Sequence, residues 1–382
     1  LLLVSFGIRH SSGLYMIPVS EHLLTGREVF GFAVAIQFLM IGFGSPLFGA
    51  IADKYGSSKA ALYGVILLII GLYMMSKVQS SLEIIISQAI FGLGSAGCGT
   101  AVVLGAVGKA VEEKNRTLSL GIVMAAGSLG QFLIVPLAGF LINLSGWTQS
   151  IIYLCFISSI MIIFCFTLTL PKKNGEDSER NNRSLKSVLD EAFANKSYNL
   201  LTLGFFVCGF HVSFVATHLP AYLEDISLPI WIGSWSLALI GLFNVFGTLM
   251  FGKMGDSKSK KNLLAILYSL RAVLFLIFIF FLKNEITILI FAALLGILWL
   301  STVPLTSGII SVIFGSRYMS MLYGFTFLSH QIGSFLGSWF GGRLYDYYGS
   351  YDIMWWICVA LGFISAAMHM PIIEKPLSQQ YS

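Results

Sequence analysis

The chain has 382 residues, of which 56% are hydrophobic and 11% are charged, and its formal net charge is +5. Long apolar runs recur from one end to the other, so the composition excludes an ordinary soluble domain and indicates a membrane protein. The positive charge is then a signal of membrane topology, and we expect no nucleic-acid partner. We expect no disulfide, no metal site and no cofactor, because every cysteine lies within an apolar run. The cysteines are Cys98, Cys155, Cys165, Cys208 and Cys358.

Twelve of the apolar runs are long enough to cross a bilayer, which takes about 20 residues in a helix. They lack the alternation of a strand, so the sequence predicts an all-α membrane protein with twelve transmembrane helices. Because the first run starts at Leu1, we expect a short piece to precede it. The predicted spans are 1–22, 29–52, 60–77, 83–108, 118–142, 148–170, 199–223, 230–252, 262–282, 286–313, 319–343 and 352–372.

The basic residues predict the orientation of these spans. Of the 23 lysines and arginines, seventeen fall on the side of the termini, four fall on the other side, and Arg9 and Arg271 fall within spans. Loops rich in lysine and arginine stay in the cytoplasm. We therefore expect a multi-pass protein of the plasma (inner) membrane, surrounded by lipid, with both termini in the cytoplasm.

Glycines recur at a spacing of 203 residues, as from Gly44 to Gly247, which indicates a duplicated unit of six spans. The halves are predicted at 1–170 and 199–382. The polar stretch between them, 171–198, is a cytoplasmic linker. Within it, Ser184 can cap a helix with an apolar stripe at Leu185, Val188, Leu189 and Phe193, so we expect an amphipathic helix there.

The loop after the second span reads GAIADKYGSSK from Gly49 to Lys59, and the loop after the eighth reads GKMGDSKSKK from Gly252 to Lys261. These loops resemble the G-x-x-x-D-[RK]-x-G-x-[RK] motif of the major facilitator superfamily, at the position and with the duplication of that family. The resemblance implies two pseudo-symmetric six-helix bundles and a secondary transporter rather than an enzyme. It also implies gating residues at the cytoplasmic end: Gly49, Asp53, Lys54, Gly56, Gly252 and Asp256.

The start of the fifth span, KNRTLSLGIVMAAG from Lys114 to Gly127, is similar to the monocarboxylate porter group of that superfamily. In those porters an arginine of the eighth span, four residues after an acidic or amide residue, binds the substrate carboxylate. Here the two matching positions are Asn244 and Thr248, so the arginine is absent and Arg9 is the candidate for its role. Gln88 stands where many proton-coupled relatives have arginine, and Val135 precedes Pro136, so the drug–proton antiporter signature is absent.

Arg9 lies 12 residues before Glu21, about 18 Å along a helix and thus near mid-membrane. A charge at that depth indicates a functional site. His211 occupies the corresponding position of the seventh span, and His218 follows seven residues later on the same helical face. The first and seventh spans line the path in this fold, so we expect the three side chains to face one another. Arginine can bind a carboxylate through two hydrogen bonds, and histidine can carry a proton.

Other polar or aromatic side chains within spans are candidates for substrate contact or for helix packing: Tyr15, Asn244, Trp299, His330 and Gln331. Arg271 lies deep in the ninth span, where we favour a structural role. No Asp or Glu lies inside a span away from its ends, so a carboxylate proton relay lacks its usual residue.

The sequence thus predicts alternating-access transport of a small organic anion, a carboxylate, with protons as the candidate coupling ion. Two alternatives stay open at this point. One is export of a hydrophobic or cationic compound, suggested by the aromatic-rich spans. The other is a nutrient sensor that has lost transport.

Overall fold

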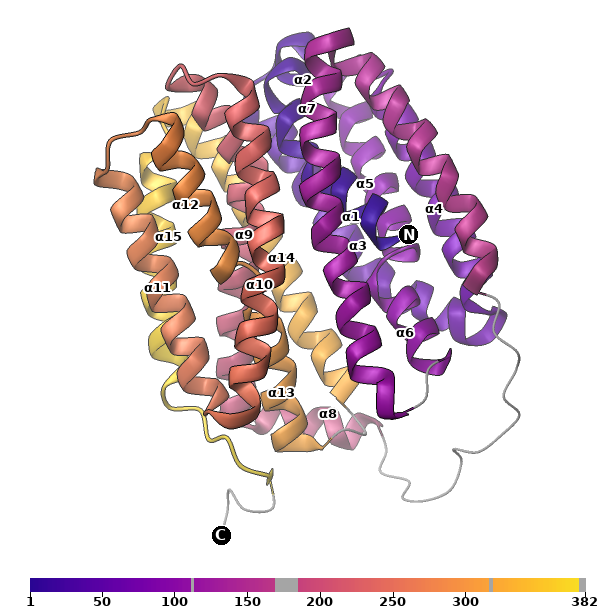
Figure 1. Cartoon of the computed structure of the whole chain (residues 1–382), viewed down its shortest axis with the longest axis vertical. Coiled ribbons are helices and arrows are strands. Elements are labelled where there is room, and N and C mark those ends of the chain that lie inside the picture. The colour runs from indigo at the N-terminus through magenta and orange to yellow at the C-terminus, as the bar shows by residue number, and fades with distance from the viewer. Residues whose placement is uncertain (111–112, 169–184, 316–318, 378–382) are drawn as a thin grey trace.

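The computed structural model describes residues 1–110, 113–168, 185–315 and 319–377. This part of the chain is helical and contains no strand. Figure 1 shows two groups of long helices side by side, the first built from the N-terminal half and the second from the C-terminal half. The predicted all-α architecture of two six-helix bundles is confirmed.

The first bundle contains α1 to α7. Two of its spans are interrupted and two are joined. The first span consists of α1, η1 and α2, the fourth of α5 and α6, and α7 runs through both the fifth and the sixth. The bounds are α1 Leu2–His10, η1 Ser12–Tyr15, α2 Met16–Leu23, α3 Arg27–Tyr55, α4 Ser57–Met75, α5 Ser81–Gly97, α6 Thr100–Ala110, α7 Glu113–Cys165 and η2 Phe166–Leu168.

The second bundle contains α9 to α15, in which α12 and α13 together form the tenth span. Its bounds are α9 Lys196–Asp225, α10 Ile230–Ser257, α11 Lys260–Phe280, α12 Glu285–Leu298, α13 Thr302–Phe314, α14 Met319–Tyr348 and α15 Asp352–His369. Between the bundles lies α8, Leu185–Ala194, over the residues for which an amphipathic helix was predicted. Val188 is buried, Phe193 packs on the rings of Tyr198 and Phe325, and the predicted cap Ser184 lies outside the described residues.

Two glycines show the duplication in the backbone. Gly146 has φ 81° and separates the fifth span from the sixth inside α7, and Gly349 has φ 70° and separates the eleventh from the twelfth. Positive φ is accessible to glycine at low cost, so the same turn recurs 203 residues apart. Each half of the chain therefore makes its last sharp turn with the same residue type.

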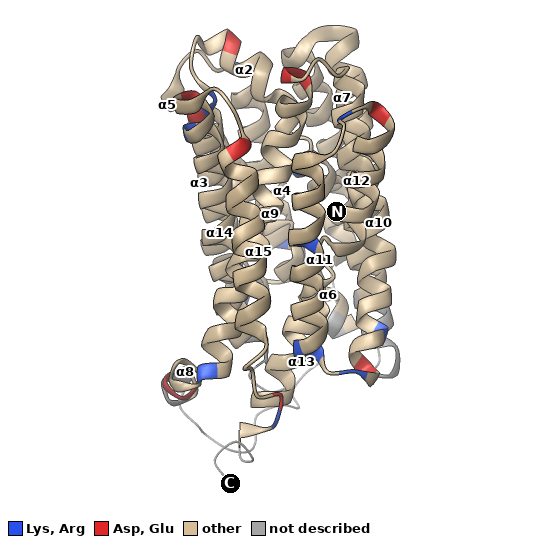
Figure 2. Cartoon of the chain, turned by 90° about the vertical axis from the view of Figure 1, so that its left-hand side faces the viewer, with Lys and Arg blue, Asp and Glu red and all other residues tan. Residues whose placement is uncertain are grey.

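The outer surface of the bundles fits a bilayer. Within the described residues, nine helical segments are long and apolar enough to cross a membrane, and one of them, Gly121–Leu168, contains two passes. Large apolar side chains such as Phe140, Phe156 and Ile163 are exposed. Figure 2 shows the charged residues gathered mainly at the two ends of the helices. We call the end with α8 and the C-terminus the linker end, and the opposite end the far end.

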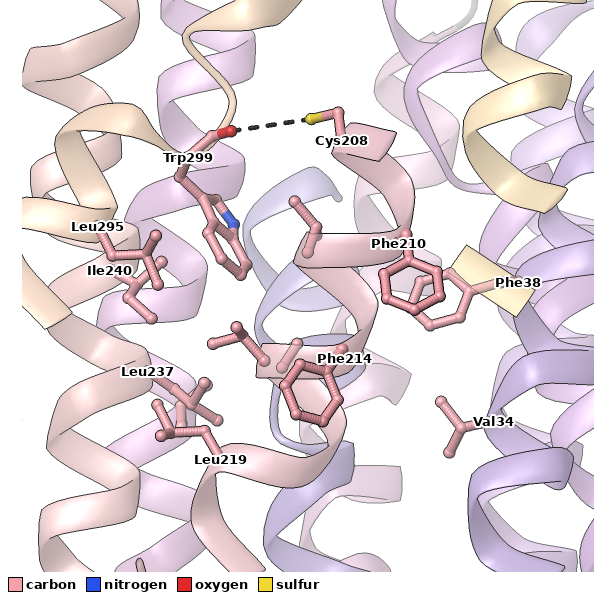
Figure 3. Close-up of a cluster of buried hydrophobic side chains, with 14 of the residues drawn as sticks. Val34, Phe38, Cys208, Phe210, Phe214, Leu219, Leu237, Ile240, Leu295 and Trp299 are labelled. Carbon is pink, nitrogen blue, oxygen red and sulfur yellow. Dashed lines mark hydrogen bonds between the residues drawn. The ribbon is translucent and has the colours of Figure 1, made fainter. Parts of the chain in front are cut away.

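The two bundles touch closely from the far end to mid-height. A methyl group on Gly13 of η1 would collide with the backbone oxygen of Ala216 in α9, and one on Gly31 of α3 would collide with that of Ser338 in α14. Such glycines let helix backbones approach without intervening side chains. Both bundles contribute to a buried apolar cluster, to which Phe38 of α3 and Phe210 of α9 belong (Figure 3).

Hydrogen bonds between the bundles, within the described residues, end at mid-height. The last ones toward the linker end join Gln331 to the backbone oxygen of Phe38, at 3.1 Å, and Asn244 to Ser128, at 3.0 Å. Closer to the linker end, a methyl group on Gly49, Gly121 or Gly324 would meet no atom within 4 Å. The structure is therefore closed at the far end and open between the bundles at the linker end.

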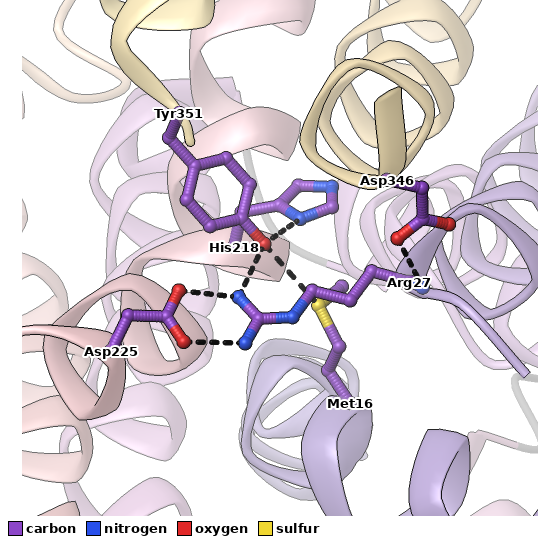
Figure 4. Close-up of polar contacts among 6 residues, drawn as sticks. All are labelled: Met16, Arg27, His218, Asp225, Asp346 and Tyr351. Carbon is purple, nitrogen blue, oxygen red and sulfur yellow. Dashed lines mark hydrogen bonds and ion pairs between the residues drawn. The ribbon is translucent and has the colours of Figure 1, made fainter. Parts of the chain in front are cut away.

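A polar cluster fastens the far end; we call Arg27, Asp225, Asp346 and Tyr351 the far-end latch (Figure 4). Arg27, the first residue of α3, makes two hydrogen bonds of 2.7 and 2.6 Å to Asp225 at the end of α9. It also donates to the Tyr351 hydroxyl at 3.1 Å. The guanidinium lies 3.8 Å from the centre of the Tyr345 ring.

Asp346 completes the latch by capping a helix of the other bundle. Its carboxylate accepts hydrogen bonds from the backbone N–H groups of Arg27, at 2.9 Å, and Glu28, at 2.7 Å. The first N–H groups of a helix have no partner within the helix, and a negative charge there is favourable. The start of α3 is thus satisfied only while the bundles meet at the far end.

We predict that Asp225→Asn opens the far end. The bidentate ion pair is lost, and because the pair is partly exposed the expected change is about 1 kcal/mol, or roughly fivefold in the closed-to-open ratio. Leu24 and Tyr347 are both highly exposed at the far end, one in each half, and all native cysteines are buried. Spin labels on Leu24→Cys and Tyr347→Cys should report a longer distance in the variant. Asp352→Asn, whose carboxylate bonds within its own bundle to Ser350, is the control. An unchanged distance distribution in Asp225→Asn would contradict the role of the latch.

Candidate functional site

The first span breaks where its arginine lies. Helix α1 ends at His10, and the Ser11 hydroxyl donates to the Ile8 carbonyl at 2.7 Å before η1 begins. Arg9 and His10 thus occupy the last turn of α1, where unpaired carbonyl groups favour a cation. Interrupted spans are common substrate sites in transporters because they expose helix ends inside the membrane.

Arg9 has no carboxylate partner among the described residues. Its Nη2 lies 3.3 Å from Nε2 of His10, and its guanidinium carbon lies 4.3 Å from the centre of the Phe6 ring. Its Nε is buried and makes no hydrogen bond, while the residue as a whole is partly exposed. A cation inside a membrane is normally paired with an anion or with backbone carbonyls. The guanidinium therefore retains donors for an anionic ligand.

The position of Arg9 along the first span suits a binding role. Four residues further toward the far end, Gly13 packs directly on the backbone of Ala216 and Thr217 in the other bundle. Toward the linker end the bundles separate, as the open space at Gly121 shows. Arg9 thus lies about one helical turn from the far-end closure, on its linker side.

The two histidines predicted to face Arg9 lie elsewhere. His211 is fully buried, with Nε2 2.9 Å from the carbonyl oxygen of Cys358 and its ring packed edge-on against Phe275. Both partners belong to the second bundle. The seven-residue spacing places His211 and His218 on one face of α9, and that face is directed into the second bundle and not toward Arg9.

His218 belongs to the support of the latch. Its Nε2 lies 2.7 Å from the Ser338 carbonyl oxygen and its Nδ1 lies 3.1 Å from the Tyr351 hydroxyl. A carbonyl can only accept, so Nε2 donates, and in the neutral ring Nδ1 then accepts from Tyr351. His218 therefore orients the tyrosine that receives a hydrogen bond from Arg27.

The tenth span breaks between α12 and α13, and two predicted site residues are found there. Arg271 is fully buried and its Nη2 donates to the backbone oxygen of Leu298 and, at 2.7 Å, to that of Trp299. Trp299 itself is fully buried. Arg271 thus supplies hydrogen bonds to the carbonyl groups that the break leaves free, as a cation does at a helix C-terminus.

Asn244 holds the other side of the same break. Its Oδ1 accepts from the backbone N–H of Leu300 at 2.9 Å, and its Nδ2 donates to the Ser128 hydroxyl of α7 at 3.0 Å. Asn244 therefore joins the broken tenth span to the opposite bundle. Thr248, at the position that matches the arginine of the monocarboxylate porters, donates to Oδ1 of Asn244 at 3.2 Å.

The remaining candidates for substrate contact are buried. The Tyr15 hydroxyl lies 2.8 Å from that of Ser150 inside the first bundle. His330 lies 3.0 Å from Gln331 through Nδ1 and Oε1, and its ring is nearly parallel to that of Phe327. Gln331 donates to α3 across the interface. Arg9 is the only one of the predicted substrate residues that is not buried.

The predicted gating loops lie at the open linker end. Lys54, Gly56 and Asp256 are exposed, and Gly252 is partly exposed. Gly49 has open space around it, and the side chain of Asp53 lies outside the described residues. Among the described side chains of these loops, no ion pair joins the two bundles. This separation agrees with the closure at the far end, because the two ends of one rocking pair of bundles do not close together.

A family model for the Major Facilitator Superfamily matches residues 1–338. The chain belongs to this superfamily. Several known transporters are similar to this chain over most of its length. The chain is 21% identical to the uncharacterized MFS-type transporter YcxA of Bacillus subtilis over 97% of its own length and 93% of that protein. It is 20% identical to the oxalate:formate antiporter of Oxalobacter formigenes over 97% and 88%, and 21% identical to monocarboxylate transporter 13 of Rattus norvegicus over 91% and 80%.

Among solved structures, a D-xylose-proton symporter has a TM-score of 0.77 at 13% identity, covering 97% of this chain and 96% of that one. The inward-open xylose transporter of E. coli has a TM-score of 0.74 at 14% identity, covering 97% and 94%. These likenesses confirm the major facilitator fold. The predicted membership of the superfamily is confirmed as well.

Sequence reasoning missed the far-end latch and His10. The latch residues lie at the ends of spans that are far apart in the chain. Charged residues are common at span ends because they are solvated there, so the sequence did not mark these four as a site. One signal was available. Asp346 is an acidic residue four positions after Gly342, one of the glycines of the 203-residue repeat, at the end of the eleventh span. His10 was masked by its neighbour Arg9, although both lie in the same apolar run.

We predict that Arg271→Leu destabilises this superfamily member. Leucine is the residue at the repeat-related position, Leu68. Here it would remove the guanidinium donor from the buried Leu298 and Trp299 carbonyls and leave that of Trp299 with only the weak Cys208 thiol donor, at 3.9 Å. Each unsatisfied buried group costs about 1–3 kcal/mol, so the midpoint of thermal unfolding in detergent should fall by several degrees. Arg271→Lys should recover part of the loss, and Arg343→Leu, at a half-exposed site, serves as the control. A wild-type midpoint in Arg271→Leu would show that the break does not need its cation.

Proposed function

We propose that this chain is a secondary transporter that carries a small organic anion, a carboxylate, across the plasma membrane by alternating access. The observation that carries the proposal is Arg9, a guanidinium inside the membrane with no carboxylate partner among the described residues. A carboxylate fits it because the planar guanidinium can donate two parallel hydrogen bonds to two oxygens.

The position of Arg9 supports transport rather than static binding. The contact of Gly13 with Ala216 and Thr217 and the latch lie between Arg9 and the far end, and among the described residues no hydrogen bond or ion pair joins the loops of the linker end. Breaking the latch and bringing the loops of Asp53 and Asp256 together would expose Arg9 to the opposite side. A two-bundle fold performs this exchange by rocking about a site at the interface.

The relatives point to the same chemical class. An oxalate:formate antiporter, a monocarboxylate transporter and, at 22% identity over 69% of this chain, the sialic acid transporter NanX of E. coli are all named for carboxylic acids. The carboxylate arginine of the eighth span is replaced here by Thr248. We infer that the first span supplies the cation instead.

Topology and domain limits complete the proposal. The excess of lysine and arginine on the side of the termini assigns the linker end to the cytoplasm. The described structure is then the inward-facing state. Residues 1–170 and 199–382 form the rocking units, and 171–198 connect them.

We predict that carboxylates stabilise the wild-type protein and do not stabilise Arg9→Gln. A ligand that binds the folded state at 100 times its dissociation constant adds about 2.7 kcal/mol, which raises the unfolding midpoint by a few degrees. The test is a thermal-shift series with formate, oxalate, lactate and sialic acid, with xylose as the neutral compound and tetraphenylphosphonium as the organic cation.

Two variants sharpen the comparison. Arg9→Lys keeps a positive charge but loses the planar donor pair, so it should retain a reduced response. Arg343→Gln removes an arginine from the far end and should respond like the wild type. Equal stabilisation of wild type and Arg9→Gln by carboxylates, or stabilisation by the organic cation alone, would contradict the proposal and favour export of a cationic compound.

A further inference from the structure

The bond between Arg9 and His10 fixes the protonation state of the histidine. Arginine nitrogens donate and cannot accept. At 3.3 Å, Nε2 of His10 is therefore the acceptor and carries no proton, which makes His10 a neutral imidazole with its proton on Nδ1. In this state the imidazole accepts a hydrogen bond from Nη2 of Arg9, so this N–H group is not available to a ligand.

Protonation of His10 would reverse this arrangement. A proton on Nε2 removes the lone pair that accepts from Arg9, and two cations then lie side by side in a membrane interior. Like charges destabilise each other strongly in such surroundings unless an anion joins them. A carboxylate on Arg9 would supply that negative charge, so proton binding at His10 and anion binding at Arg9 should favour each other.

The surroundings of His10 leave Arg9 as its charged neighbour. Helix α7, which packs along α1, contains no Asp, Glu, Lys, Arg or His from Gly121 to Cys165. In η1 the Tyr15 hydroxyl is bonded to Ser150, and from α5 the end residue Cys98 lies 3.6 Å from Ser5. The described neighbours thus provide no negative charge for a protonated His10.

The other five histidines have different partners. Four have a ring nitrogen within 3.1 Å of a backbone oxygen, and His330 bonds to an amide oxygen; these are His22, His211, His218, His330 and His369. His10 differs from all of them because its ring nitrogen receives a hydrogen bond from a cation. It is therefore the histidine whose protonation changes the anion site directly.

We propose that His10 couples proton movement to anion transport: it takes up one proton on Nε2 when a carboxylate binds to Arg9, and both leave together on the other side. This inference rests on the proposed function, because it requires an anion at Arg9. When the anion leaves, Arg9 again donates to Nε2, which releases the proton. With His10 neutral again, the empty carrier returns with the single charge of Arg9 instead of two adjacent charges.

The test is proton uptake on anion binding. The purified wild-type protein is placed in weakly buffered detergent solution at pH 6.5 with a pH-indicator dye, and the stabilising carboxylate, formate or oxalate, is added. These anions stay ionised at this pH because carboxyl groups titrate near pH 4. We expect uptake of up to one proton per bound anion, and tighter binding at pH 5.5 than at pH 7.5 by about fivefold or more.

His10→Asn should abolish the uptake and make the affinity equal at both pH values within about twofold, while the anion still binds. His10→Gln, which keeps an oxygen acceptor for Arg9, is a second variant in case the first does not fold. His22→Asn, at the far end, should behave like the wild type. A variant that binds the anion with the wild-type pH dependence, or a wild type that takes up no proton, would overturn the role of His10.

Failure of the proposed function gives a different result. If no carboxylate binds the wild type, or if Arg9→Gln binds it equally well, the anion site itself is absent and the inference about His10 falls with it. If binding depends on Arg9 and uptake survives in His10→Asn but disappears in His330→Gln, the anion site stands and the proton is carried by the second bundle.

Discussion

The structure depends on one constraint, that a positive charge withdrawn from water must find negative or dipolar partners. The described part of the chain meets this constraint in three ways. Arg27 has the carboxylate of Asp225, and Arg271 has two carbonyl groups set free by a break in the tenth span. Arg9 has an aromatic ring and a neutral imidazole only. The first two arginines stabilise a conformation or a helix break, and the third is left for a ligand.

These polar sites arise where the two halves of the duplicated chain differ. Arg271 stands at the position of Leu68, and Asn244 at that of Ile41, 203 residues earlier. The fourth span breaks at the same place as the tenth, at Cys98, but there Gly64 packs directly on the backbone of Gly97 and Cys98, so no cation is needed. Likewise the first span is broken beside Arg9, whereas α9 is continuous through His211. The common backbone provides the rocking framework, and single replacements in it create the sites.

Much of the architecture follows from the sequence, because apolar length, the glycine repeat and the loop motif each report a local or periodic property. The direction of side chains does not follow in the same way. Helix α9 buries residues on all sides, so its pattern contains no polar face to show that His211 and His218 point into the second bundle. Asp346 caps α3 across the interface, and no local pattern in either segment indicates the partner. The Arg9–His10 pair was adjacent in the sequence, yet only the geometry shows which nitrogen accepts.

The most direct test of this account is a structure of the protein bound to the carboxylate that stabilises it most. The account predicts the carboxylate oxygens within hydrogen-bond distance of the Arg9 guanidinium, with the bond from Arg9 to Nε2 of His10 broken. A carboxylate bound away from the first span, with Arg9 still resting on Phe6 and bonded to His10, would contradict it.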